Sequence, residues 1–401
     1  MSRSIADTPA FPTDSDSRER QGTSRIALPL EMQLWIEVSL LIAFGLIMIY
    51  SASSVLPFKN FSDKAEIARS SIHYLSRQMI CIALGVGTMM VLRRVPYQWF
   101  TYHSRWMLLA VFGALLLVLV PGLGAELNGA RRWFSFKGFL LQPAEYAKVV
   151  WVLYLGVSLV KKQERINRAR VSFWPHIFLC GILAGLLLKE PDFGTTFMIG
   201  CLTIVMLALG GVPLQNLFIL VPIALGGFYK FVYMVPYRWE RITAFLNPWE
   251  DRLDSGYQLI QAWIAVGSGG LLGKGLGAGQ QKLFYLPEPY TDFILAVIGE
   301  ELGFLGIVTV CALFLCFFRT GLQISRCAPD LLGTLFALGL TMMISLQALL
   351  NMGVVLGLVP TKGLPLPFIS YGGSAFTANC VAVGILMGIA RSGERRIKQN
   401  V

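Results

Sequence analysis

The sequence predicts an all-α integral membrane protein with about ten transmembrane helices and with both termini in the cytoplasm. Of its 401 residues, 55% are hydrophobic and only 14% are charged, whereas about 25% of the residues in an ordinary soluble domain are charged. The mean hydropathy is +0.61. Apolar runs of the length that crosses a bilayer, about 20 residues, recur along the chain, with basic clusters between them.

The composition excludes several other classes of protein. The net charge of +11 comes from short clusters of Lys and Arg between apolar runs, so it indicates membrane orientation and not nucleic-acid binding. The seven cysteines form no CxxC pair and lie mostly in apolar runs, as small buried hydrophobes do. The three histidines are scattered, so neither a histidine metal site nor a serine-histidine triad is expected.

Three segments divide the chain. Residues 1–30 are rich in Ser, Arg, Asp and Pro and lack an apolar core long enough for a signal peptide, so we expect a disordered cytoplasmic tail. Residues 31–391 form the predicted membrane domain, and residues 392–401 form a second cytoplasmic tail. The predicted spans are residues 33–53, 77–95, 105–121, 142–160, 174–189, 193–211, 214–234, 290–318, 331–358 and 367–390.

The positions of the basic residues predict the orientation. With the N-terminus inside, the cytoplasmic connections and the C-terminal tail are basic and contain few acids. The bias is incomplete, because Arg131, Arg132 and Lys137 fall outside. The outside connections are residues 54–76, 122–141, a tight turn near 190, a large loop at 235–289, which joins the seventh and eighth spans, and residues 359–366.

Two of the outside segments are more than simple connections. The stretch NGARRWFSFKGF, residues 128–139, mixes cations with aromatic rings and predicts an amphipathic piece at the bilayer surface. Arg131 and Arg132 then either anchor this piece or hold an anionic lipid headgroup. The loop 235–289 is large enough to cover a site, and loops of that length without strong regular structure are usually functional or disordered.

The glycine-rich run GSGGLLGKGLGAG, residues 267–279, does not fit a nucleotide-binding loop. A P-loop requires G-x-x-x-x-G-K-[ST], but Ser268 stands where the first glycine is needed and Gly275 follows Lys274. We expect instead a backbone that turns tightly or approaches a ligand closely. Lys274 and Lys282 would then be available to bind phosphate.

Charged residues inside the apolar spans indicate a polar interior. Glu145 and Lys148 share one face of the fourth span at i, i+3. Because an isolated ion at the bilayer centre costs at least about 2.5–3.5 kcal/mol, this pair is either a structural ion pair or part of a substrate cavity. Glu300 and Glu301 lie about two turns below Asp292 and should point into protein or water.

Two further motifs lie at the outer ends of spans. In the turn KEPDFGTT, Asp192 either caps the next helix together with Thr195 or takes part in catalysis. The stretch PTKGLPLPFISYGGS, residues 360–374, contains helix-breaking prolines and glycines and predicts a re-entrant or capping loop. This loop would present Lys362, Ser370 and Tyr371 to the same outward cavity as Asp292.

Five motifs together resemble the SEDS family (shape, elongation, division and sporulation) of bacterial peptidoglycan polymerases. They are NGARRW, QPAEYAK, KEPDFGTT, YQLIQAWIAVGSGGLLGKGLGAGQQKLFYLPEPYTDFILAVIGEELG and NMGVVLGLVPTKGLPLPFISYGGS, and the resemblance covers nearly all of residues 33–391. The forms GAGQQKLFYLPE and PTKGLPLPF are similar to the division branch rather than the elongation branch. The resemblance implies ten transmembrane helices with both ends cytoplasmic, in agreement with the span count.

The resemblance also implies an activity, a location and partners. Lipid II would donate disaccharide-pentapeptide units at the outer face of the bacterial cytoplasmic (inner) membrane, at the division septum. Asp292 matches the family's essential aspartate in a His-Thr-Asp-Phe motif, but Tyr290 replaces the histidine. The implied partners are a class B penicillin-binding protein, which is the septal transpeptidase, and the divisome activator proteins.

The expected reaction is an inverting glycosyl transfer. The 4-hydroxyl of one sugar attacks the anomeric carbon of another, and a carboxylate acting as general base, here Asp292, accelerates such an attack by about 10²–10⁴-fold. Cations stabilise the leaving diphosphate, and Mg²⁺ or Mn²⁺ bound mainly through diphosphate oxygens is the expected cofactor. The predicted substrate-binding residues are Arg131, Arg132, Glu145, Lys148, Lys274, Lys282, Lys362 and Ser370.

Two other functions are compatible with the sequence. A transporter that flips lipid II would also contain buried ions and broken helices, but the long outside loop joined to a surface aspartate favours an enzyme. A scaffold that only recruits a transpeptidase agrees with the basic tails and leaves the intramembrane charges without a role.

Overall fold

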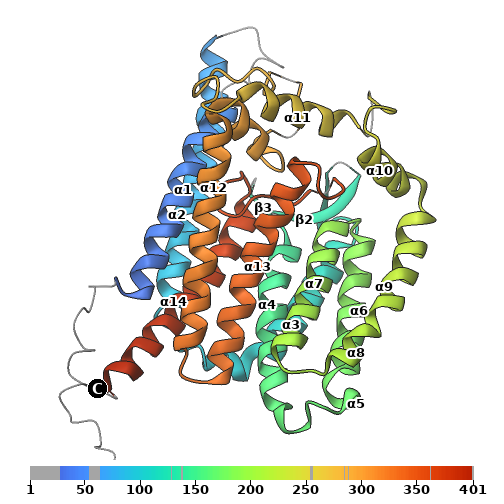
Figure 1. Cartoon of the computed structure of the whole chain (residues 1–401), viewed down its shortest axis with the longest axis vertical. Coiled ribbons are helices and arrows are strands. Elements are labelled where there is room, and N and C mark those ends of the chain that lie inside the picture. The colour runs from blue at the N-terminus through green and yellow to red at the C-terminus, as the bar shows by residue number, and fades with distance from the viewer. Residues whose placement is uncertain are drawn as a thin grey trace, which may run out of the picture.

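The computed structural model describes residues 28–53, 64–127, 129–136, 139–252, 256–283, 285–287, 289–361 and 363–399. Long helices run alongside one another, and a small sheet and the helices α10 and α11 lie at one end of the bundle (Figure 1). The helical elements of the bundle are α1 (Leu30–Ser53), α2 (Lys64–Leu92), α3 (Trp99–Val118), α4 (Pro143–Lys161), α6 (Trp174–Lys189), α7 (Phe193–Leu209), α8 (Leu214–Phe218), α9 (Leu220–Phe228), η4 (Tyr229–Tyr233), α12 (Ile294–Cys327), α13 (Leu331–Val355) and α14 (Gly373–Gln399). The shorter elements are β1 (Gly124–Leu127), β2 (Ala130–Phe136), β3 (Phe139–Leu141), η3 (Gln163–Arg165), α5 (Ala169–Ser172), α10 (Pro236–Leu246) and α11 (Tyr257–Gly269).

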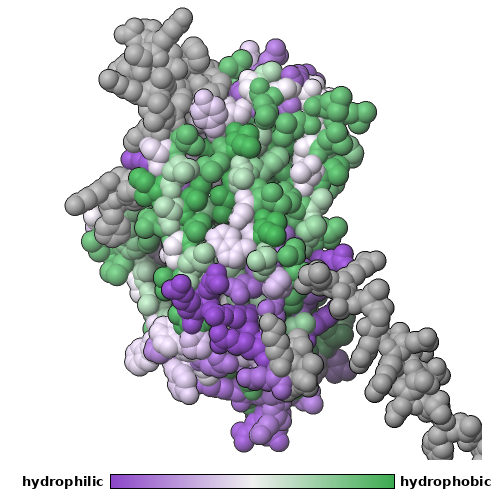
Figure 2. Space-filling view, turned by 90° about the vertical axis from the view of Figure 1, so that its left-hand side faces the viewer, coloured by the Kyte–Doolittle hydropathy of each residue, from purple (hydrophilic) through white to green (hydrophobic). Residues whose placement is uncertain are grey.

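The helices confirm the predicted class of integral membrane protein. Within the described residues, nine helical segments are long and apolar enough to cross a bilayer, and α7 is a shorter apolar helix. Figure 2 shows a broad hydrophobic belt, with hydrophilic residues gathered at the end where α5 and the C-terminal part of α14 lie in Figure 1. The predicted tail 1–30 lies almost entirely outside the described residues.

Three helices form the centre of the bundle. In the apolar stretches of α4, α13 and α14, 83%, 67% and 78% of the residues are buried, compared with 6% in the stretch Leu214–Tyr233. Polar side chains on α4 and α13 are therefore shielded from lipid. The segment Leu214–Tyr233, made of α8, α9 and the π-helical η4, lies at the periphery.

The strands β1, β2 and β3 give the stretch 128–139 a regular structure that the sequence interpretation did not specify, since it expected only an amphipathic piece at the bilayer surface. The three strands are antiparallel in the order β1-β2-β3, and Glu126 lies opposite Arg131. The sequence Asn128-Gly129 is a strong hairpin signal, and Gly129 has φ +73°. This cross-strand pair of opposite charges also favours the register that is observed.

The eighth predicted span differs from α12 in both its bounds and its continuity. The helix begins at Ile294 and continues to Cys327, and its backbone is broken at Gly303, with φ 66° and ψ −161°. A side chain is excluded at this break, since a Cβ on Gly303 would lie 2.4 Å from the backbone nitrogen of Gly273. The glycine-rich run thus packs its backbone directly against the break.

The helix ends also differ from the prediction elsewhere. The helix α2 begins at Lys64, well before residue 77, and α14 continues to Gln399, into the segment predicted as a tail. The helix α14 continues past residue 390 because most of the residues that follow, among them Arg, Glu and Lys, are good helix formers. The loop 235–289 has more regular structure than expected, since it contains α10 and α11, and α11 packs against α12.

Candidate active site

A cavity of about 920 Å³ lies where the sheet, α10, α11, the loop that precedes α14 and the start of α14 meet. Its walls combine carboxylates with guanidinium groups, an arrangement suited to a polar, anionic substrate with a reacting hydroxyl. The charged residues in these walls are Arg77, Arg132, Glu145, Asp192, Arg241 and Asp292. The predicted residues Arg132, Glu145 and Asp292 are thereby brought to one cavity.

Asp292 lies two residues before the first turn of α12, and the backbone around it is held from α13 and from the loop that precedes α14. Its carbonyl oxygen accepts a hydrogen bond of 2.8 Å from the side-chain amide of Asn351. The preceding carbonyl, of Thr291, accepts a hydrogen bond from the hydroxyl of Ser370. The carboxylate lies close to Gly363, since a Cβ at that position would lie 2.8 Å from Oδ2 of Asp292.

The turn between α6 and α7 forms another wall of the cavity. Arg132 donates hydrogen bonds to the carbonyl oxygens of Glu190, at 2.8 Å, and Pro191, at 2.7 Å. Asp192 caps α7 by accepting from the backbone nitrogen of Thr195 at 3.0 Å, which confirms the capping interpretation. Arg132 therefore reaches the cavity with its guanidinium group already oriented.

Glu145 and Lys148 form the predicted ion pair. Their side chains are 2.8 Å apart and only 4% and 1% exposed. Lys148 also donates a 2.6 Å hydrogen bond to Oε1 of Gln347 on α13. Of the two residues, only Glu145 lines the cavity within the part of the chain that the structure describes.

Two other predicted substrate-binding residues, Arg131 and Ser370, are not among the described residues that line the cavity. Arg131 forms an exposed ion pair of 3.0 Å with Glu126. Ser370 is buried, and its hydroxyl both accepts a hydrogen bond from the backbone nitrogen of Leu366 and donates one to the loop that carries Asp292. Lys362 lies outside the described residues.

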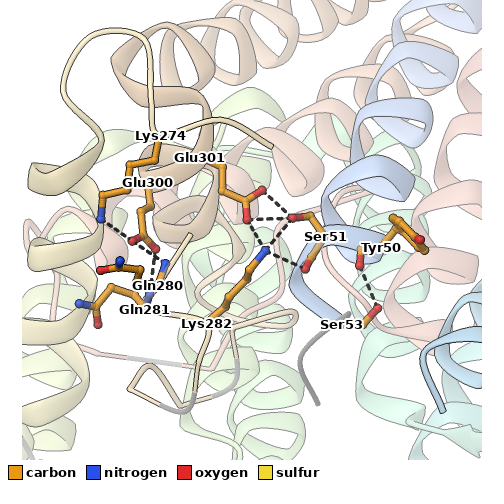
Figure 3. A network of polar contacts seen from close by, with 9 residues as sticks. All are labelled: Tyr50, Ser51, Ser53, Lys274, Gln280, Gln281, Lys282, Glu300 and Glu301. Atoms are coloured by element: carbon orange, nitrogen blue, oxygen red, sulfur yellow. Dashed lines mark hydrogen bonds and ion pairs between the residues drawn. The ribbon is translucent and has the colours of Figure 1, made fainter. Parts of the chain in front are cut away.

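Lys274 and Lys282 pair with Glu300 and Glu301 in a separate polar network (Figure 3). Lys282 lies 2.6 Å from Glu301, and these two side chains are 2% and 0% exposed. Ser51 of α1 donates to the same carboxylate. Neither lysine is among the described residues that line the cavity. The partners of both are protein carboxylates and not a substrate phosphate.

Two cavity cations, Arg77 and Arg241, were missed by the sequence interpretation. Arg77 lies on α2, and Arg241 lies on α10 in the large loop. The signal for Arg77 was its position at the outer end of the second predicted span, where the chain leaves the membrane. For Arg241 the sequence carried no comparable signal, because many polar residues surround it.

Glu190 is an unusual buried acid beside this wall. It is 0% exposed, and neither of its carboxyl oxygens has a hydrogen-bond partner among the described residues. Burial, reinforced by repulsion from Asp192 and opposed by attraction to Arg132, raises the pKa of Glu190 to about 8. The carboxyl is thus mostly protonated at neutral pH.

Replacing Glu190 with Gln is expected to increase thermal stability near pH 8. Because the folded-state pKa lies above the usual value of 4.5, the unfolded state releases its proton first, and wild-type stability falls as the pH rises from about 4.5 to about 8. Each unit of pKa difference corresponds to about 1.4 kcal/mol. Tm measured in detergent across this range should decline less in Glu190→Gln than in wild type, and Glu126→Gln, at an exposed acid, is the control. Parallel declines would contradict a raised pKa.

The chain has relatives among known proteins. A family described as "cell cycle protein", comprising FtsW, RodA and SpoVE, matches residues 31–395. A Geobacter metallireducens protein named probable peptidoglycan glycosyltransferase FtsW is 43% identical over 350 residues, which cover 87% of this chain and 92% of that protein.

Two solved structures share the fold. One is a chain from a peptidoglycan synthase complex that coordinates polymerization and crosslinking, with a TM-score of 0.71, 27% identity, and coverage of 90% of this chain and 97% of that chain. The other is the rod shape-determining protein RodA of Thermus thermophilus, with a TM-score of 0.63, 27% identity, and coverage of 89% and 95%.

Proposed function

The chain belongs to the cell cycle protein family of FtsW, RodA and SpoVE, and on that premise we propose that it polymerises lipid II into β-1,4 glycan strands during septal cell division. It is a peptidoglycan glycosyltransferase that acts at the outer face of the bacterial inner membrane. The observation that carries the proposal is the position of Asp292 in the wall of a 920 Å³ cavity that Arg77, Arg132 and Arg241 also line.

Asp292 supplies the general base. A sugar hydroxyl is a weak nucleophile at neutral pH, and a positioned carboxylate that accepts its proton lowers the barrier to attack. The 4-hydroxyl oxygen then bonds to the anomeric carbon of the donor sugar as the bond from that carbon to the lipid diphosphate breaks. Attack opposite the leaving group inverts the anomeric configuration.

The cavity arginines stabilise the leaving diphosphate. Negative charge accumulates on its oxygens as the glycosidic bond breaks, and cations fixed in advance stabilise such charge without reorganising during the reaction. Arg132 is fixed in this way by the carbonyl oxygens of Glu190 and Pro191. Arg77 and Arg241 take the place that the sequence interpretation gave to Lys274 and Lys282.

A divalent cation, Mg²⁺ or Mn²⁺, would accompany the diphosphate. Among the described residues, no three His, Cys, Asp or Glu side chains form a group able to hold a metal ion, so diphosphate oxygens would supply most of its ligands. The carboxylate of Asp192 is a hard oxygen donor in the wall of the same cavity and would fit such an ion, which leaves the carboxylate of Asp292 to act as the base. When bound, it would neutralise charge on the leaving group.

The proposed partners follow from the family and its neighbours. The solved chain from the peptidoglycan synthase complex supports pairing with a crosslinking enzyme, here a class B penicillin-binding protein at the septum. Divisome activator proteins would control the pair. The runner-up function is a lipid II flippase, for which the buried ions would mark a transport path.

A reconstitution experiment separates polymerase from flippase. The full chain is placed in liposomes, with and without a class B penicillin-binding protein whose transpeptidase serine is replaced, and fluorescent lipid II is added only to the outer leaflet. A polymerase yields a ladder of glycan products from this lipid. Transfer of the label to the inner leaflet without any ladder, in both samples, would overturn the proposal.

A further inference from the structure

Two buried amides on α13, Gln347 and Asn351, are one helical turn apart. Asn351 contacts the segment that carries Asp292, and both contact the loop 363–366. They are 0% and 1% exposed. Burial of an amide is costly unless it is hydrogen-bonded, so two of them in one apolar helix require partners. Each donates to backbone carbonyl oxygens around the cavity.

Asn351 joins two distant segments of the chain. Its side-chain nitrogen donates one hydrogen bond to the carbonyl oxygen of Asp292, at 2.8 Å, and another to the carbonyl oxygen of Leu364, at 2.7 Å. Both amide hydrogens are therefore used on backbone acceptors. The loop that approaches the carboxylate of Asp292 at Gly363 is thus fixed to the same side chain as the backbone of Asp292.

Gln347 extends this arrangement to the buried ion pair. Its Nε2 donates to the carbonyl oxygen of Pro365 at 2.8 Å, and its Oε1 accepts from Lys148 at 2.6 Å. Lys148 in turn pairs with Glu145 at 2.8 Å. A continuous chain of polar contacts, two of them charge-assisted through Lys148, therefore runs from Glu145 in the cavity wall to Pro365, which lines the same cavity.

We propose that Gln347 and Asn351 are positioning residues that together hold Asp292 and the loop 363–366 in the geometry needed for proton transfer. The inference rests on the proposed role of Asp292 as general base. Neither amide is among the described residues that line the cavity. Asn351 contacts backbone, and Gln347 contacts backbone and Lys148, so their loss moves the base without removing it. A misplacement of about 1 Å can lower turnover by about 10²-fold.

The test compares isosteric changes in the full chain. Asn351→Asp removes both donors, and Gln347→Glu keeps the acceptor for Lys148 while it removes the donor to Pro365. We expect each to lower kcat for lipid II polymerisation by about 10–100-fold with KM changed less than about threefold. Hydrogen exchange should increase in the peptides covering residues 289–293 and 363–370.

Asn379→Leu provides a matched control, because Asn379 is another buried amide, 2% exposed, on α14. Its side-chain nitrogen has no hydrogen-bond partner among the described residues, so kcat per folded molecule should stay within about twofold. If Asn351→Asp does not fold, Gln347→Glu alone decides. Wild-type kcat and unchanged exchange in a folded Gln347→Glu protein would overturn the inference, even where Asp292→Asn is inactive.

A different result identifies failure of the proposed function itself, namely that the wild-type chain forms no glycan ladder from lipid II. If wild type forms the ladder and Asp292→Asn retains normal turnover, Asp292 is not the base, and the positioning inference falls with it. If Asp292→Asn is inactive while the α13 variants keep wild-type kcat and exchange, only the positioning inference falls.

Discussion

Replacing Asp292 with Asn is expected to lower the rate of lipid II polymerisation by at least about 10²-fold, the contribution typical of a positioned general base. The amide has the shape of the carboxylate but cannot accept the proton of the attacking hydroxyl. The backbone contacts of Asp292 with Asn351 do not involve its side chain, so the fold should be retained. Turnover is measured on purified full chain with fluorescent lipid II.

The control for this variant is another change of an acid to its amide. Glu126→Gln removes a carboxylate whose ion pair with Arg131 is exposed, and it should leave turnover within about twofold. Both variants should share the Tm and gel-filtration profile of wild type. Turnover of Asp292→Asn within about threefold of wild type would remove Asp292 from the reaction.

Local patterns predicted the parts of the fold that depend on local physics. The apolar runs identified the bundle because a membrane span is defined by its own length and hydropathy. Glu145 and Lys148 were predictable as a pair because their spacing places them on one helix face, and the 2.8 Å contact confirms it. The sheet was not predicted, although Asn128-Gly129 is a typical hairpin turn sequence. The cations and aromatic residues of the stretch were interpreted instead as a segment that lies at the bilayer surface.

The partners of isolated cations were not predictable from local patterns. Lys274 and Lys282 were assigned to phosphate because they lie in or just after a glycine-rich run whose backbone could approach a ligand closely. Their partners Glu300 and Glu301 reach them only after the chain has folded back. That return depends on the break at Gly303, against which Gly273 packs. Arg77 likewise lines the cavity together with residues that are distant in the sequence, such as Asp292.

Replacing Lys282 with Met is expected to destabilise the protein by about 3–5 kcal/mol, because it leaves a fully buried carboxylate without its cation. Glu301 would keep only the hydroxyl of Ser51 among the partners described above. The double variant Lys282→Met with Glu301→Leu removes both charges and should recover most of the lost stability. Tm of the purified proteins in one detergent gives the comparison.

Lys274→Met is the matched control, because Lys274 is 31% exposed and its partner Glu300 keeps two backbone donors, the nitrogens of Gln280 and Gln281. Its loss of stability should therefore be smaller than that of Lys282→Met. The two roles of Lys282 predict different KM values for the double variant. A structural pair predicts a KM for lipid II like that of wild type, whereas a role in binding diphosphate predicts a raised KM even when stability is restored. A double variant with wild-type Tm and a KM for lipid II raised about tenfold or more would therefore assign Lys282 to the substrate and contradict a structural pair.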